Sequence, residues 1–159
     1  MLTAASGNVV VADPPNKRLT IYSLTGKTLR NISCPLLSNN QVSICAGHGD
    51  DVIIADWQTN KVFRFNINTW NVMWTFTHPH HPQGLVCYGD YILVAACNSN
   101  IIYTLSYATG EKVSEMRGDA IHTSSLFRDP IRSLSVTGNT LLVPQYWTHK
   151  LLFYRLSEK

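Results

Sequence analysis

The sequence predicts an all-β protein of the β-propeller type, with about four blades of four antiparallel strands. A glycine turn, an apolar run, a polar turn and a second apolar run occur in this order four times, beginning at Gly7, Gly49, Gly89 and Gly138. The last residues of the four first runs lie 43, 40 and 49 residues apart. A period in the forties with about four strands per unit is typical of propeller blades.

The first apolar run of each repeat is expected to form the second strand of its blade, at residues 9–12, 52–55, 91–96 and 141–143. These runs are apolar at nearly every position, which indicates that both faces of each strand are covered, as in stacked blades. The second runs are rich in β-branched and aromatic residues, which favour inner sheet positions. Between the two runs lie PPN, WQTN, CNSN and YWTH, whose composition is typical of tight hairpin turns.

The remaining strands complete the predicted blades. Fourth strands are expected at residues 27–33, 71–77 and 111–117, and first strands at 2–5, 42–46, 84–88 and 131–136. The resulting blades span about residues 1–36, 41–78, 83–118 and 130–159 of a single domain. The first blade begins inside its own first strand, and the last stops after its third.

This pattern predicts a propeller that is incomplete at both ends. An open array of blades leaves apolar faces exposed, whereas propellers retain only short, protected edges. We therefore expect the chain to be part of a larger propeller. Two alternatives are a small ring of four blades that closes on itself, and self-association of two copies through their open blade edges.

The repeats share a pattern that is counted from the last residue of the first run, called here the anchor residue. A basic residue stands five positions after the anchor, an aliphatic residue six after it, and an aromatic residue or Leu nine after it. In the first repeat these positions hold Asp13, Arg18, Leu19 and Tyr22, and in the second they hold Asp56, Lys61, Val62 and Phe65. The third repeat has Ala96, Ile101, Ile102 and Leu105, and the fourth has Gln145, Lys150, Leu151 and Tyr154.

This pattern resembles the NHL repeat, which has a glycine turn, an apolar strand ending in V-A-D, a short turn with Asn, then R-V and a Phe. The resemblance covers essentially the whole chain and is stronger in the first two repeats, because the third and fourth lack the anchor Asp. It implies a binding module of the kind found at the C-terminus of tripartite-motif proteins. The four cysteines provide no RING or B-box zinc site. The segment YATGEKV from Tyr107 also resembles turns of quinoprotein-type and WD-repeat propellers.

Composition predicts a cytoplasmic protein without membrane contact. The chain is 45% hydrophobic and 14% charged, and its apolar runs are too short to span a bilayer. Its four cysteines are widely spaced, which favours reduced, partly buried thiols over a zinc ribbon or a disulfide framework. The formal net charge of +3 permits contact with acidic partners without requiring it.

The anchor residue and the base five positions later should face each other across one hairpin. The first two repeats keep both charges, the third has neither, and the fourth keeps the base alone. The loss of both charges together in the third repeat favours a structural ion pair between them. Such a pair adds little to the stability of the protein where it is exposed. The alternative is a set of bases, Arg18, Lys61 and Lys150, that is presented to a partner.

In the usual blade order, the hairpin between the second and third strands lies on the same face as the links between blades. This face is our predicted partner-binding surface, for a protein or peptide. Its residues are Arg18, Trp57, Lys61, His80, His81, His122, Arg128, Tyr146, Trp147 and Lys150. Aromatic residues interleaved with bases also suit single-stranded RNA, which is the alternative partner. A further possibility is that Trp57 and Trp147 only cover neighbouring blades.

We expect no enzyme activity, no cofactor and no metal. The stretch HPHHP holds His78 and His80 two residues apart, but a metal site would need further ligands from another blade. The predicted innermost strands carry no Asp, Glu or His. Asp50, Asp51 and Asp90 are interpreted as solvated turn residues. The alternative from another class is a metal-dependent propeller hydrolase or lyase.

Overall fold

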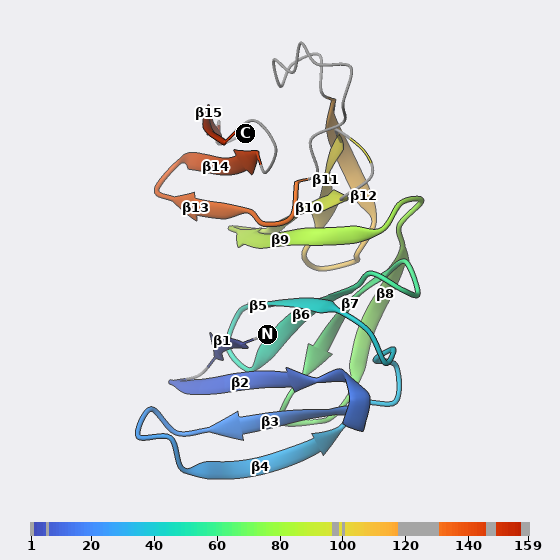
Figure 1. Ribbon diagram of the computed structural model, residues 1–159, viewed down its shortest axis with the longest axis vertical. Coiled ribbons are helices and arrows are strands. Elements are labelled where there is room, and N and C mark those ends of the chain that lie inside the picture. The colour runs from blue at the N-terminus through green and yellow to red at the C-terminus, as the bar shows by residue number, and fades with distance from the viewer. Residues whose placement is uncertain are drawn as a thin grey trace. The chain divides into compact units, whose positions relative to one another are not determined.

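The computed structural model describes residues 2–5, 7–96, 99, 101–117, 131–145 and 149–156. These residues form fifteen β-strands and one short 3-10 turn, arranged in four antiparallel sheets (Figure 1). The chain divides into two compact units, Met1–Pro79 and His80–Lys159, and each unit contains two of the sheets. The four sheets are called blades 1 to 4 in chain order, and the two units are described separately.

Unit 1 contains two blades whose strands are hydrogen-bonded in the order in which they occur in the chain. Blade 1 consists of β1 (Leu2–Ala5), β2 (Asn8–Asp13), β3 (Arg18–Tyr22) and β4 (Thr28–Ser33), with the 3-10 turn η1 (Pro14–Asn16) between β2 and β3. Blade 2 consists of β5 (Val42–Ala46), β6 (Asp51–Asp56), β7 (Lys61–Asn66) and β8 (Val72–Thr77). This simple up-and-down order confirms the predicted blade topology of unit 1.

Unit 2 has the same strand order in its two blades. Blade 3 consists of β9 (Pro82–Tyr88), β10 (Tyr91–Ala96), β11 (Ile101–Ser106) and β12 (Lys112–Arg117). Blade 4 has three strands among the described residues, β13 (Ser135–Thr137), β14 (Thr140–Gln145) and β15 (Lys150–Arg155). The all-β, four-sheet prediction is therefore confirmed.

One predicted strand is shorter in the structure. Residues 131–136 were expected to form the first strand of blade 4, but β13 covers only Ser135–Thr137. The preceding residues lie over β9 instead, because a Cβ built on Gly84 would stand 3.1 Å from Leu134 Cγ and 3.3 Å from the carbonyl carbon of Ser133. Ile131 and Leu134 are buried in the core of unit 2 without belonging to a strand.

The repeat glycines explain the tight connection between the first two strands of each blade. Gly7, Gly49, Gly89 and Gly138 all have positive φ angles, of 72°, 58°, 51° and 53°. Residues with a Cβ rarely adopt this conformation, and glycine adopts it without steric cost. The recurring glycine is therefore a requirement of the turn geometry.

Each unit is held together by an apolar core between its two sheets. In unit 1, Val10, Leu19 and Ile21 of blade 1 belong to the same buried cluster as Ile54 and Phe63 of blade 2. In unit 2, residues of β10, β11 and β14 form an equivalent cluster, with Ile131 and Leu134 added. Burial of this kind contributes about 25 cal/mol per Å² of apolar surface.

The expectation that second strands are covered on both faces is confirmed in two blades only. All six residues of β6 are buried, as are five of the six in β10. Burial alternates along β2 and β14 instead. Successive residues of a strand point to opposite faces of its sheet, so one face of blade 1 and one face of blade 4 remain partly exposed.

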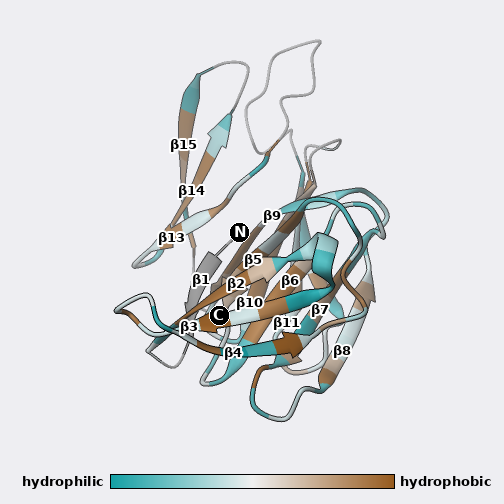
Figure 2. Ribbon diagram, turned by 60° about the horizontal axis from the view of Figure 1, so that its bottom comes forward, coloured by the Kyte–Doolittle hydropathy of each residue, from teal (hydrophilic) through white to brown (hydrophobic). Residues whose placement is uncertain are grey.

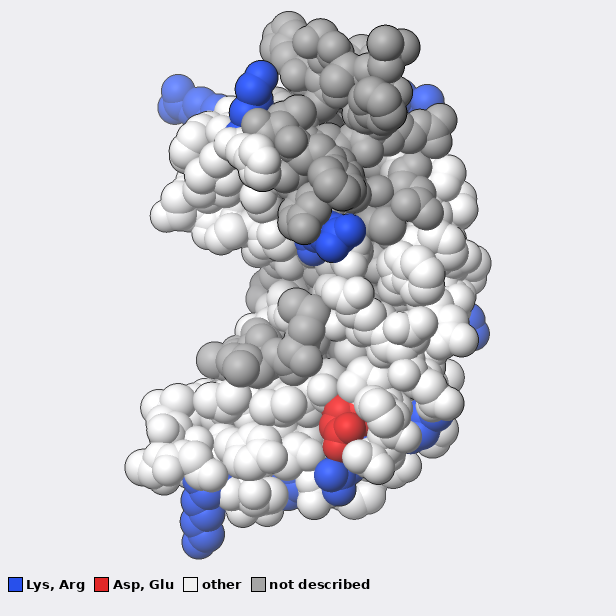
Figure 3. Space-filling view, in the orientation of Figure 1, with Lys and Arg blue, Asp and Glu red and all other residues white. Residues whose placement is uncertain are grey.

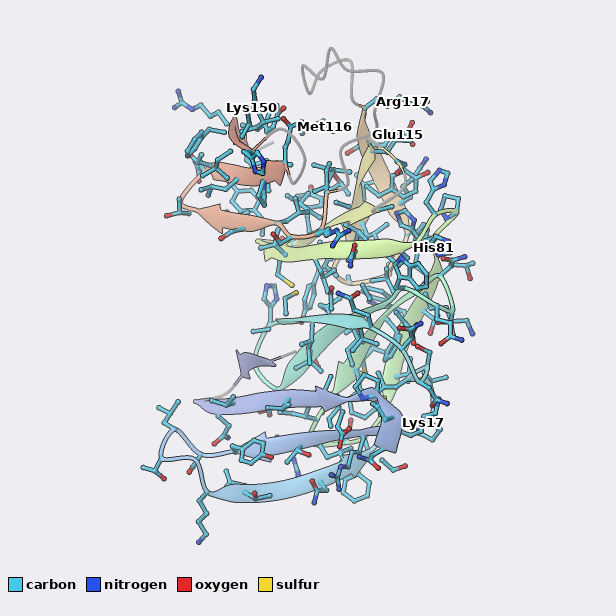
Figure 4. All side chains as sticks on the ribbon, viewed as in Figure 1. Lys17, His81, Glu115, Met116, Arg117 and Lys150 are labelled. Atoms are coloured by element: carbon cyan, nitrogen blue, oxygen red, sulfur yellow. The ribbon has the colours of Figure 1, made fainter. Side chains whose placement is uncertain are left out.

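The edge strand of blade 3 is charged. Glu115 accepts from Lys112 Nζ at 3.1 Å and pairs with Arg117 at 2.5 Å, and these two cations hold its pKa below the usual range. Figure 4 shows Glu115 and Arg117 together on β12. Charged side chains on an edge strand oppose pairing with another chain.

No helix among the described residues has the length and apolar character needed to cross a membrane.

Candidate functional site

The candidate partner-binding surface that the structure describes best lies in unit 1. It consists of the β2–β3 hairpin, the β6–β7 hairpin and the link at residues 34–41 between the two blades, and we call it the link face. The N–H of Cys34 donates to the Lys17 carbonyl at 2.7 Å, and the N–H of Trp57 donates to the Gln41 carbonyl at 3.4 Å. Lys17 Nζ also donates to the Leu37 carbonyl. The expected grouping of hairpins and link on one face is therefore observed in this unit.

The two hairpins share an unusual backbone conformation at the same repeat position. Four residues after the anchor, Lys17 and Asn60 have φ angles of 51° and 57°. Their carbonyls accept hydrogen bonds from the first residues of the following links, Cys34 and His78, each at 2.7 Å. In blade 4 the equivalent residue, His149, has a φ of 53°. The left-handed residue thus directs a carbonyl toward the next link in both blades of unit 1.

Asp56 is the central polar residue of the link face. Its side chain is fully buried, with 0% exposure. Its carboxylate accepts three backbone hydrogen bonds, from Ser38 N at 2.7 Å, Gln58 N at 3.0 Å and Thr59 N at 3.1 Å. Because a buried charge must be compensated by hydrogen bonds, these contacts fix the hairpin and the link in one arrangement.

The two anchor carboxylates of unit 1 have different roles. Asp13 forms the expected ion pair with Arg18, at 2.9 Å, and its pKa is lowered by hydrogen bonds from Asn16 and Arg18. Asp56 lies opposite Lys61 in the strand register, but the described residues show no ion pair between them. The prediction of a structural pair is correct for blade 1 and wrong for blade 2, because burial turns the carboxylate of Asp56 toward backbone amides.

A second correction concerns the acidic turns at the opposite end of blade 2. Asp51 was expected to be solvated, but it is only 4% exposed. Its carboxylate pairs with Arg64 at 2.6 Å and accepts from Asn66 Nδ2 at 2.8 Å. The adjacent apolar run places Asp51 inside the sheet, so a buried partner is needed to compensate its charge.

Six of the ten residues predicted for the binding surface lie within the described residues. Arg18, Trp57 and Lys61 belong to unit 1, where Arg18 is exposed and the other two are half-buried. The others in unit 2 are His80, His81 and Lys150; Lys150 is exposed and both histidines are half-buried. His122, Arg128, Tyr146 and Trp147 lie outside the described residues.

Unit 2 does not bring its predicted site residues together in one cluster. Figure 4 shows His81 near the start of β9 and Lys150 at the start of β15, well apart. Figure 3 shows the basic side chains of the described surface in separate small groups on the face that it displays. Among the described residues, the predicted surface is therefore most complete in unit 1, which carries Arg18, Trp57 and Lys61.

The histidine stretch has a structural component. His78 is 1% exposed, its backbone N–H donates to the Asn60 carbonyl, and its ring stands edge-on to Phe76 at 6.1 Å between centroids. It occupies the position of Cys34 in the preceding blade, where the residue is also buried. Among the described residues, no group of three or more His, Cys, Asp or Glu side chains is arranged to hold a metal ion.

The structure also reveals a pocket in unit 2 that the sequence did not indicate. It has a volume of about 530 Å³ and lies between blade 3 and the β13–β14 turn and β15 end of blade 4. Its lining includes Leu93, Val113, Met116, Tyr91 and Arg155. Tyr91 and Val113 are unusually exposed for large apolar residues, at 37% and 56%. No motif marks this pocket, because its lining comes from seven separate places in the sequence.

Comparisons with solved structures support the propeller class. The chain resembles virginiamycin B lyase from Staphylococcus aureus, solved as a catalytically inactive variant with quinupristin, with a TM-score of 0.76 and 15% identity over 98% of this chain and 51% of that one. It resembles BamB from Moraxella catarrhalis with a TM-score of 0.67 and 18% identity over 96% and 42% of the two chains. It resembles hydrazine synthase from Kuenenia stuttgartiensis with a TM-score of 0.74 and 15% identity, over 97% of this chain and 45% of that one.

These similarities establish a β-propeller fold, and the chain spans about half the length of these solved propellers. No protein-family model matches the chain, and no curated protein matches its sequence.

Proposed function

We propose that the chain is a non-catalytic propeller binding module that presents the link face to a protein or peptide partner. The observation that carries this proposal is the hydrogen-bonded arrangement of the link. Asp56 joins the link to the β6–β7 hairpin, and Lys17 joins it to the β2–β3 hairpin. On this surface Arg18, Trp57 and Lys61 keep part of their side chains accessible. Rigid presentation lowers the entropic cost of binding, and Trp and Arg are enriched among energetically important contact residues.

The charge of the link face favours an acidic partner. Lys61 is half-buried and forms no ion pair with the anchor carboxylate opposite it, so its ammonium can pair with a partner's carboxylate. Arg18 shares its guanidinium with Asp13. An acidic peptide with an aromatic or aliphatic residue beside its carboxylates would match a surface that carries both bases and Trp57.

The same proposal includes the finer assignments made from the sequence. We infer that the repeats are of NHL type, as the glycine turns and the Asp13–Arg18 pair support, and that the module belongs to a tripartite-motif-like protein. We place it in the cytoplasm, because the described cysteines Cys34, Cys45 and Cys87 form no disulfide.

The test selects acidic peptides from a displayed library on the immobilised chain and measures the best binder by calorimetry. Trp57→Ala and Lys61→Ala should each weaken binding by about tenfold or more. Trp70→Ala is the matched control, because Trp70 is 57% exposed and lies in the β7–β8 turn, away from the link face. Equal binding by all three variants would contradict the proposal.

Two further measurements separate the alternatives. The first is binding of a single-stranded RNA oligonucleotide to the same face. If it binds, and its affinity falls steeply between low and moderate salt, the partner is RNA and not a protein. Stoichiometric zinc or calcium in the purified protein would instead favour the metal-dependent hydrolase or lyase.

The pocket of unit 2 supports a second binding function, for a small apolar ligand or an apolar side chain. A volume of about 530 Å³ lies within the range of ligand pockets. Leu93, Val113 and Met116 provide apolar lining, and Arg155 adds one cation that could pair with a carboxylate. A screen of aromatic carboxylic acids by ligand-observed NMR tests this function. Binding should disappear in Ser114→Trp, which fills the pocket, and persist in Trp57→Ala.

A further inference from the structure

Each blade has two faces with distinct roles within its unit. The face that packs on the next blade in the chain is called the following face, and the face that packs on the previous blade is called the preceding face. In blade 1 the following-face residues of β2 and β3 are covered by blade 2, and none of them exceeds 5% exposure. These residues are Val10, Ala12, Leu19 and Ile21.

Unit 2 repeats this contact between blades 3 and 4. Leu93, Ala95 and Ile102, on the following face of blade 3, belong to one cluster with Leu141 and Val143 on the preceding face of blade 4. In both units the following face packs through the same repeat positions. These are one and three residues before the anchor residue and six residues after it. The chain therefore contains two examples of one interface.

Blade 4 has a following face that the described residues do not cover. The equivalent positions hold Leu142, Pro144, Leu151 and Phe153, which lie on one side of the sheet because Leu142 pairs with Phe153 and Pro144 with Leu151. Leu151 is 47% exposed and Phe153 is 64% exposed. Leu19 and Ile21, at the same positions in blade 1, are 0% and 3% exposed. Figure 2 shows hydrophobic colouring along most of β14 and β15.

Blade 1 has the complementary surface. Its preceding face holds Val9, Val11, Thr20 and Tyr22, at positions where blade 2 has Val52, Ile54, Phe63 and Phe65. Those four residues of blade 2 are at most 3% exposed, whereas Val9, Val11 and Tyr22 are only half-buried. Neither this face nor the following face of blade 4 has a charged residue among its four positions.

We propose that the following face of blade 4 packs against the preceding face of blade 1 in a second copy of this chain, forming a dimer with two such contacts. Each contact repeats, between copies, the interface that joins blades 1 and 2 and blades 3 and 4. The chain spans 51% of one solved propeller and 45% of another, so two copies together come close to the length of one such propeller. Uncovered apolar sheet faces of this kind mark association surfaces.

The first experiment measures the oligomeric state of the full chain by sedimentation velocity from about 1 to 100 μM. The wild-type chain should sediment as a dimer, and Phe153→Glu and Tyr22→Glu should each raise the dissociation constant at least about a hundredfold. Met73→Glu is the matched control, because Met73 is 53% exposed on β8 and belongs to neither face. Circular dichroism shows whether each variant remains folded.

The second experiment mixes the two disrupted variants. A copy with Phe153→Glu retains an intact blade 1, and a copy with Tyr22→Glu retains an intact blade 4. The mixture should therefore form a heterodimer through one intact contact, although each variant alone is monomeric. A contact of blade 4 with another blade 4 would not be restored in this way.

The proposal is overturned if the wild-type chain is monomeric at 100 μM, if Tyr22→Glu leaves the dimer intact, or if the mixed variants do not associate. A monomer would show that something other than a second copy covers blade 4. Disruption by Met73→Glu to the same extent would also contradict it, because the contact would then lie on another surface.

Discussion

The backbone N–H of Ser38 donates to Oδ2 of Asp56 at 2.7 Å, and this bond joins the link between two blades to the second strand of the next blade. The other oxygen of the same carboxylate accepts from Gln58 N and Thr59 N in the hairpin. One buried side chain therefore joins the link to the β6–β7 hairpin of the candidate binding face.

Asp56→Ala should destabilise the protein by roughly 2–5 kcal/mol, because it removes the acceptor of three backbone N–H groups. Asp56→Asn retains one acceptor oxygen and should cost less. Urea denaturation measures both. Asp13→Ala is the control, since Asp13 occupies the same repeat position at the surface, and it should leave the unfolding midpoint nearly unchanged. Equal losses for Asp13→Ala and Asp56→Ala would contradict this assignment.

Arg64→Met should lower the free energy of unfolding by roughly 3 kcal/mol, because it leaves the buried carboxylate of Asp51 without its guanidinium partner. Methionine retains most of the apolar part of the arginine side chain, so the lost stability reflects the missing positive charge. Arg18→Met removes an exposed pair, with the Arg18 side chain 44% exposed, and should have little effect. Thermal melts of both variants make the comparison, and a small effect in Arg64→Met would show that Asp51 is compensated without the pair.

His149→Gly should stabilise the protein by about 0.5–1 kcal/mol. His149 has a φ of 53°, a left-handed conformation that costs a residue with a Cβ about 1–2 kcal/mol, and glycine recovers part of this despite its greater freedom in the unfolded chain. Lys150→Gly, one residue later in β15, should destabilise instead. Chemical denaturation distinguishes the two, and a loss of stability in His149→Gly would contradict the strain argument.

Stability should fall above pH 9 because of Cys34. Burial raises the pKa of this thiol to about 11, above the ordinary value of 9.0 that applies in the unfolded chain. The unfolded state therefore releases its proton first, and the contribution of Cys34 to stability is complete below pH 9 and is lost between pH 9 and 11. The loss should be roughly 1.4 kcal/mol per pH unit in that window.

The control for this pH dependence is Cys34→Ala, measured by denaturation at pH 7, 9 and 10.5. Other groups titrate above pH 9, so the difference in slope between wild type and variant isolates Cys34. Identical pH dependence of stability in wild type and variant would mean that burial does not raise the pKa of the Cys34 thiol. At pH 8 Cys34 should also react more slowly with iodoacetamide than Cys45 or Cys87, which are only half-buried.

The blades follow from local features of the sequence. Strands β1, β5 and β10 have the predicted boundaries, because apolar runs bounded by turn residues determine strand length. The glycines at 7, 49, 89 and 138 mark the turns, because their positive φ angles exclude most other residues. Prediction failed at residues 131–134, where an apolar pattern like that of a strand instead packs over Gly84.

The candidate site could be predicted less well. Repeat alignment placed Arg18 and Lys61 opposite the anchor carboxylates, as the register confirms. It could not predict that Asp13 forms a surface ion pair whereas Asp56 is buried and accepts backbone hydrogen bonds. Both residues end similar runs, V-A-D and I-A-D. The pocket of unit 2 had no sequence signal.

The sequence by itself determined the strands, the turns and their fourfold repetition, because these depend on residue spacing and on local backbone preferences. Only the tertiary structure decided which carboxylates are buried, that residues 131–134 lie over β9, and that Leu151 and Phe153 are exposed where their counterparts in blade 1 are covered. These properties depend on which sheet packs against which, and packing joins residues that are distant in the sequence.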